Sequence, residues 1–127
     1  AACGGKQALF NAACTILSEG DEVLIPKPYW VTFPEIVTFC RAQTRFIETE
    51  ATNFVLTADQ VRNAITDKTK LLIVNSPNNP TGAGIPAAEM HRIVETCAER
   101  NIYVLTDECY LFFAYPPAEV FTSAVLP

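Results

Sequence analysis

The chain has 127 residues, of which 50% are hydrophobic and 18% are charged, a composition typical of one globular domain and unlike that of a disordered segment. The net charge of −5 and the scattered placement of the nine Lys and Arg residues argue against a nucleic-acid partner, because phosphate binding needs clustered bases. No apolar run approaches the roughly 20 residues of a membrane span, and the first residues do not read as a signal peptide, so no membrane partner is expected.

The first half of the chain predicts two helices and two strands. A glycine pair, Gly4-Gly5, precedes a helix expected from Lys6 to Leu17, for which Gly20 is a natural C-terminal cap. The next expected elements are a buried strand over Val23–Ile25 ended by prolines, a helix over Phe33–Arg41 with a proline in its first turn, and a strand over Thr44–Ile47.

The second half continues the alternation of helix and strand. Thr57 and Gln60 form a capping box that opens a helix through Ile65. The remaining expected elements are a strand over Leu71–Val74, an amphipathic helix over Pro86–Arg100 and a strand over Ile102–Leu105. Strands separated by helices need crossover connections, so the fold class is α/β, a mostly parallel sheet with helices on both faces.

Polar or aromatic residues follow three of these strands and mark a candidate site. They are the segments Pro26–Trp30, Asn75–Gly82 and Thr106–Tyr110, and the Gly4-Gly5 turn adds a fourth element at a helix start. Ligands of parallel sheets bind at the carboxyl ends of the strands. The four segments are therefore expected to converge on one crevice if the strands are neighbours.

Two of these elements suggest ways to hold a flat, phosphorylated ligand. The backbone N–H groups of Gly4, Gly5 and Lys6 at a helix start can bind an anion, although a glycine pair there can also be a plain turn. Trp30, the only tryptophan, can stack on a flat ring, although a tryptophan in a loop is more often ordinary core packing.

The segment after the last strand offers polar contacts to a ring. Asp107 can accept a hydrogen bond from a protonated ring nitrogen, and Tyr110 can reach a ring oxygen; a helix N-cap or a loop ion pair is the alternative for Asp107. The lone histidine, His91, is expected to be a solvated surface residue. One histidine cannot build a Ser-His-Asp triad, and no metal-ligand cluster is expected.

The cysteines number five, an odd count without a Cys-x-x-Cys pair. A zinc site or a disulfide framework is therefore not expected. Most of the cysteines are expected to be small buried hydrophobic residues in a reducing compartment, and a cytoplasmic location is the default. They are Cys3, Cys14, Cys40, Cys97 and Cys109.

Five motifs, in this order and spacing, make the chain resemble the fold-type I, class I/II aminotransferases, which depend on pyridoxal 5'-phosphate. They are Gly4–Asn11, Gly20–Ile25, Pro28–Glu35, Asn75–Gly82 and Asp107–Tyr110. The bacterial aspartate aminotransferase subgroup looks most similar. The resemblance covers nearly the whole chain and implies that residues 1–127 are an internal part of the cofactor-binding large domain, with no complete second domain.

The resemblance also implies a role for each candidate residue. Gly4, Gly5 and Lys6 are expected to bind the cofactor phosphate, and Trp30 to stack on the pyridine ring. Asn79 and Tyr110 are expected to hydrogen-bond the phenolic oxygen of the ring, and Asp107 to pair with its nitrogen. Trp30 and Asn79 are also expected to face the substrate, and Asp107 and Tyr110 to act in catalysis.

Two family residues have no counterpart in this sequence. Members of the family carry a Schiff-base lysine in a Ser-x-Ser-Lys type context, and none of the lysines here, at positions 6, 27, 68 and 70, lies in that context. The arginine that binds the substrate carboxylate in the family is also absent. The chain by itself is therefore expected to be inactive.

The expected function is the cofactor-binding part of an aminotransferase that transfers an amino group between an aspartate-like amino acid and a 2-oxo acid. The parent protein is expected to be a homodimer. A fold-type I lyase or synthase, which can share the cofactor residues, is one alternative. A non-catalytic α/β ligand-binding module is another, although the Gly-x-Gly-x-x-Gly spacing of a dinucleotide site is absent.

Overall fold

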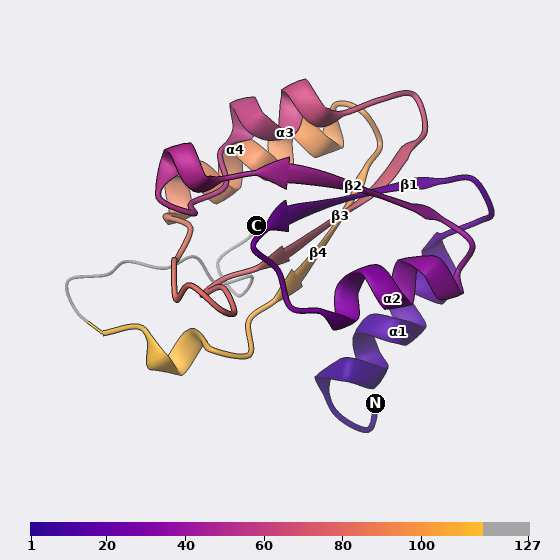
Figure 1. The fold of residues 1–127 in the computed structure, drawn as a ribbon, viewed down its shortest axis with the longest axis horizontal. Coiled ribbons are helices and arrows are strands. Elements are labelled where there is room, and N and C mark those ends of the chain that lie inside the picture. The colour runs from indigo at the N-terminus through magenta and orange to yellow at the C-terminus, as the bar shows by residue number, and fades with distance from the viewer. Residues whose placement is uncertain (116–127) are drawn as a thin grey trace.

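The computed structural model describes residues 1–115, in which helices and strands alternate along the chain (Figure 1). Two short 3-10 turns, η1 (Glu50–Thr52) and η2 (Leu111–Phe113), accompany the main elements. The main elements are α1 (Gly5–Ile16), β1 (Glu22–Lys27), α2 (Thr32–Phe39), β2 (Gln43–Glu48), α3 (Ala58–Ala64), β3 (Thr69–Asn75), α4 (Ala87–Ala98) and β4 (Tyr103–Asp107).

The four strands form one sheet in the order β2-β1-β3-β4, and every neighbouring pair is parallel. The predicted α/β class with a parallel sheet is confirmed. The chain runs from β1 outward to β2 and then returns to place β3 on the other side of β1. Ligand sites of open α/β sheets lie where the strand order reverses in this way.

Helices cover both faces of the sheet, with α1 and α2 on one face and α3 and α4 on the other (Figure 1). Alternate residues of β3 serve the two cores, because successive side chains of a strand point to opposite faces. Leu71 and Ile73 pack with α1 and α2, whereas Leu72 and Val74 pack with α3 and α4. All four of these side chains are buried, which explains the continuous apolar run of this strand.

The C-terminal cap of α1 differs from the prediction, although the helix ends within one residue of the predicted Leu17. The helix ends at Ile16, and its C-cap is Leu17 in an extended conformation, so Gly20 is not the cap. Instead, the Asp21 carboxylate accepts a hydrogen bond from the backbone N–H of Ser18 at 2.8 Å, which turns the chain toward β1. Gly20 supplies a positive φ of 90° within this turn.

The strand β1 is longer than predicted, since it continues through Pro26 to Lys27. Its pairing with β3 extends only to Leu24, whereas its pairing with β2 continues to the end of the strand. Beyond Leu24, β1 therefore pairs with a strand on one side only. Pro26, which has no backbone N–H group to donate, is tolerated there for this reason.

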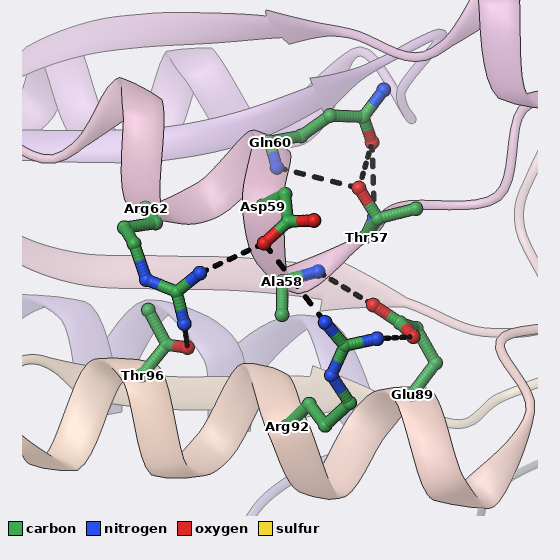
Figure 2. A network of polar contacts seen from close by, with 8 residues as sticks. All are labelled: Thr57, Ala58, Asp59, Gln60, Arg62, Glu89, Arg92 and Thr96. Atoms are coloured by element: carbon green, nitrogen blue, oxygen red, sulfur yellow. Dashed lines mark hydrogen bonds and ion pairs between the residues drawn. The ribbon is translucent and has the colours of Figure 1, made fainter.

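A network of polar contacts joins α3 to α4 (Figure 2). The predicted capping box is confirmed: Thr57 accepts from the Gln60 backbone N–H, and the Gln60 side chain accepts from the Thr57 backbone N–H. Glu89 of α4 accepts a hydrogen bond from the backbone N–H of Ala58 at 2.7 Å and pairs with Arg92 at 3.0 Å. A side chain of α4 thereby caps the start of α3.

The expectation that most cysteines are buried is wrong. Cys97 is buried and Cys40 is half-buried, whereas Cys3, Cys14 and Cys109 are exposed. Cys14 lies on the solvent side of α1, where its sulfur is 3.5 Å from that of Cys40. The small size of cysteine permits burial but does not require it, and helix orientation decides which side chains face the core.

Candidate functional site

The loop after β3 is a closed turn that presents Asn79. The Asn78 side-chain oxygen accepts hydrogen bonds from the Thr81 backbone N–H at 3.3 Å and from the Thr81 hydroxyl at 2.9 Å. The backbone N–H of Gly82 donates to the Asn78 carbonyl at 2.8 Å, and Gly82 has a φ of 74° that favours glycine. These local bonds explain why the Asn-Pro-Thr-Gly sequence forms a turn of defined shape.

The end of β4 places two further predicted site residues beside this loop. Asp107 is half-buried, and its carboxylate accepts a hydrogen bond from the Cys109 backbone N–H at 3.1 Å, which fixes the following turn. Tyr110 follows this turn, and its hydroxyl lies 3.3 Å from the donating side-chain nitrogen of Asn79. Asn79 and Tyr110 therefore lie within hydrogen-bond distance of each other.

Trp30 reaches the same region from the segment after β1. Its ring packs edge-on against Phe33 of α2, with 5.5 Å between the ring centroids. The Asn78 side chain donates to the Pro28 carbonyl at 3.2 Å, a bond that ties the segment after β1 to the loop after β3. Trp30 is half-buried, so it packs on the core and also lines the surface of the site.

These residues surround one small cavity of about 70 Å³ at the carboxyl ends of β3 and β4. Its lining residues are Trp30, Asn75, Asn79, Asp107, Cys109 and Tyr110. The structure thus brings together four of the predicted site residues, as expected from the strand order. A larger hollow of about 510 Å³ shares Asn79 and Tyr110 with this cavity.

The glycine pair and Lys6 are not among the residues that line the cavity. Gly4 and Gly5 form the exposed start of α1, and no side chain caps this end of the helix. The ammonium group of Lys6 lies 5.1 Å from the centroid of the Trp30 ring, a cation–π contact that links the first turn of α1 to a residue that lines the cavity. The N-terminal N–H groups of α1 can therefore serve an anion that extends out from the cavity.

Two lining residues, Asn75 and Cys109, were not among the predicted site residues. Asn75 is 8% exposed, and its side chain bonds to both Asn79 and Asp107. A signal was present, since a polar residue ends an otherwise apolar buried strand. Cys109 carries no comparable sequence signal, and the Asp107 turn alone brings it to the cavity.

His91 is exposed on α4, as predicted. No group of three or more His, Cys, Asp or Glu side chains within residues 1–115 can hold a metal ion. Among the same residues, no helix is long and apolar enough to cross a membrane.

Comparison with known proteins identifies relatives of the whole chain. The profile of the family described as aminotransferase class I and II matches residues 1–125. A probable aspartate/prephenate aminotransferase of Aquifex aeolicus is 42% identical over 122 residues, and an aspartate aminotransferase of Bacillus sp. (strain YM-2) is 45% identical over 122 residues. Each alignment covers 95% of this chain but only 31% of the relative.

Solved structures of similar proteins have the same fold. The aspartate aminotransferase of Thermus thermophilus with maleate superposes with a TM-score of 0.90 at 43% identity, over 95% of this chain and 32% of that one. An aromatic aminotransferase of Pyrococcus horikoshii superposes with a TM-score of 0.91 at 35% identity, over 97% of this chain and 33% of that one.

Proposed function

Because this chain belongs to the class I and II aminotransferase family, we propose that it forms the cofactor-binding part of a pyridoxal 5'-phosphate-dependent aminotransferase. The proposed reaction transfers an amino group from an aspartate-like amino acid to a 2-oxo acid. The observation that supports it most is the single cavity shared by Trp30, Asn79, Asp107 and Tyr110. The aspartate-like donor is proposed because the two relatives described above are named as an aspartate/prephenate aminotransferase and an aspartate aminotransferase.

The residues around the cavity fit the chemical groups of pyridoxal 5'-phosphate. The ring nitrogen needs an anionic acceptor, for which Asp107 is the candidate. The phenolic oxygen needs hydrogen-bond donors. The side-chain nitrogen of Asn79 and the hydroxyl oxygen of Tyr110 lie 3.3 Å apart, so both groups can donate to one oxygen. Trp30 offers a flat face for the ring, and the uncapped start of α1 offers backbone N–H groups for the phosphate.

Asp107 has the central electrostatic role in this proposal. When bound, pyridoxal 5'-phosphate supplies an electron sink for the charge that develops at the α-carbon of the substrate. A carboxylate at the end of β4 keeps the proton on the ring nitrogen, because an adjacent negative charge favours the protonated form of a base. The bond from Cys109 to Asp107 holds the carboxylate in place without an additional side chain.

The remaining residues bind and orient. Asn79 and Tyr110 stabilise the anionic form of the phenolic oxygen, since each provides a hydrogen-bond donor. Trp30 fixes the plane of the ring, and Gly4, Gly5 and Lys6 hold the phosphate mainly through backbone amides. The family's Schiff-base lysine and its substrate-binding arginine have no candidate among the residues of this chain.

Partners and location belong to the same proposal. An amino acid and a 2-oxo acid are the proposed substrates, and the full-length protein is proposed to be a cytoplasmic homodimer. Family membership supports these assignments.

The decisive test is Asp107→Ala in the full-length protein. Loss of a preorganised charge that acts mainly in the transition state is expected to lower kcat by about a hundredfold or more. Bound cofactor, measured by absorbance, is expected to decrease much less. Asp67→Ala is the matched control, because Asp67 is exposed in the turn between α3 and β3 and does not line the cavity.

The measurement uses aspartate and 2-oxoglutarate, with identification of the products. Near-normal kcat in Asp107→Ala would refute the role of this carboxylate. Elimination or condensation products in place of glutamate and oxaloacetate would favour a fold-type I lyase or synthase instead. Ligand binding without turnover in the full-length protein would favour the non-catalytic module.

A further inference from the structure

Asn75 is a nearly buried amide at the end of β3 whose two polar atoms are both engaged. Its side-chain nitrogen donates to the backbone carbonyl of Asp107 at 2.9 Å. Its side-chain oxygen accepts from the backbone N–H of Asn79 at 2.7 Å. One short side chain therefore links two of the residues that line the cavity.

The link spans the two strands that carry the proposed contacts. Asn75 lies opposite Asp107 in the parallel register of β3 and β4, and the Ser76 backbone N–H also donates to the Asp107 carbonyl, at 3.1 Å. The backbone of Asp107 is thus held by two bonds from the end of β3. The backbone of Asn79 is held by the same side chain, four residues along the chain.

The chemistry of this position requires both a donor and an acceptor. Aspartate can accept from the Asn79 N–H but cannot donate to the Asp107 carbonyl, and leucine has the same branched shape but no polar atom. Glutamine carries the same amide on a side chain that is one methylene group longer. The amide of asparagine is the group that matches both partners at this distance from the backbone.

We propose that Asn75 is a positioning residue of the cofactor site, which sets the spacing between the Asp107 carboxylate and the donor group of Asn79. The inference rests on the proposed function, because the spacing matters if these two residues contact the nitrogen and the phenolic oxygen of one ring. Asn75 itself acts through its neighbours and needs no contact with the reacting atoms.

The expected consequence of losing Asn75 is a change in the proton affinity of the bound cofactor. Without the bond to Asn79, the loop and its side-chain donor move away from the phenolic oxygen, and the anionic form of that oxygen loses stabilisation. The pH midpoint of the absorbance change of bound pyridoxal 5'-phosphate is expected to rise by about one unit. The kcat is expected to fall by about tenfold to a hundredfold, because small displacements in a site are costly.

The experiment compares Asn75→Ala and Asn75→Leu with the unchanged full-length protein. Leucine preserves the size of the side chain, and alanine leaves space in which water can bond to the freed partners. Thr69→Ala is the matched control, because Thr69 is as buried as Asn75 and lies at the opposite end of β3, where its hydroxyl accepts from the backbone N–H of Thr66 at 2.9 Å, away from the residues that line the cavity. The readouts are cooperative unfolding, the dissociation constant for pyridoxal 5'-phosphate, and its absorbance against pH.

An upward shift of the midpoint in a folded Asn75 variant, without a comparable shift in Thr69→Ala, supports the proposal. An unchanged midpoint, or an equal shift in Thr69→Ala, overturns it, since a merely structural role predicts that result. If the unchanged protein binds and turns over normally, such an outcome contradicts only the role of Asn75. If the unchanged protein binds no pyridoxal 5'-phosphate, the proposed function fails and the role of Asn75 fails with it.

Discussion

The Glu89 carboxylate caps α3 from the neighbouring helix α4, and Glu89→Ala is expected to weaken the contact between these helices (Figure 2). The backbone N–H of Ala58 is fully buried, so removal of its acceptor leaves an unpaired donor at a cost of about 1–3 kcal/mol. The pair with Arg92 adds about 0.3–0.5 kcal/mol, because the Arg92 side chain is largely exposed. The higher helix propensity of alanine offsets that smaller contribution by a few tenths of a kcal/mol.

The net expected loss in the free energy of unfolding is therefore about 1–3 kcal/mol, and it should be concentrated at the start of α3. Denaturant unfolding of the full-length protein measures the total, and amide hydrogen exchange of peptides covering Ala58–Ala64 measures the local effect. Glu95→Ala is the control, because Glu95 is exposed on the same helix, and a change within about 0.5 kcal/mol is expected. Equal stabilities of the two variants, with unchanged exchange in α3, would contradict the capping role of Glu89.

Two predictions concern the cysteines, whose ordinary pKa is 9.0. Burial raises the pKa of the Cys97 thiol to about 11, so the folded state favours the protonated form. The resulting contribution to the free energy of unfolding is fully present below about pH 9 and falls by up to about 3 kcal/mol as the pH rises to about 11. In Cys97→Ala, the free energy of unfolding should therefore depend less on pH between these values. Desolvation by burial and the hydrogen bond with Cys14 raise the pKa of Cys40 to about 11. Iodoacetamide at neutral pH should therefore label Cys40 at least about tenfold more slowly than exposed Cys109, as measured by peptide mass mapping. Equal labelling rates of the two cysteines would contradict this prediction.

Local sequence determined which helices and strands form and in which order the segments of the candidate site follow one another along the chain. The capping box of Thr57 and Gln60 defines the start of α3 through contacts three residues apart, which a sequence displays directly. The apolar run of β3 likewise specifies a strand that is buried on both faces. The helical spacing of the apolar residues in α4 specifies a helix that is buried on one face. With strands and helices alternating, the parallel order places the segments after β1, β3 and β4 at one edge of the sheet.

The tertiary structure decided the contacts between residues that are distant in the sequence. Glu89 caps Ala58, 31 positions away, and Asn75 bonds to Asp107, 32 positions away, because helix packing and strand register place these groups together. The C-terminal cap of α1 was misassigned to Gly20 because the competing turn depends on the Asp21 side chain, and the exposed cysteines were misassigned because burial depends on which side of a helix meets the sheet. Local patterns specify which element forms, whereas the partner of each polar group depends on how the elements pack, and that packing is what joins Asn75, Asn79 and Asp107 in one site.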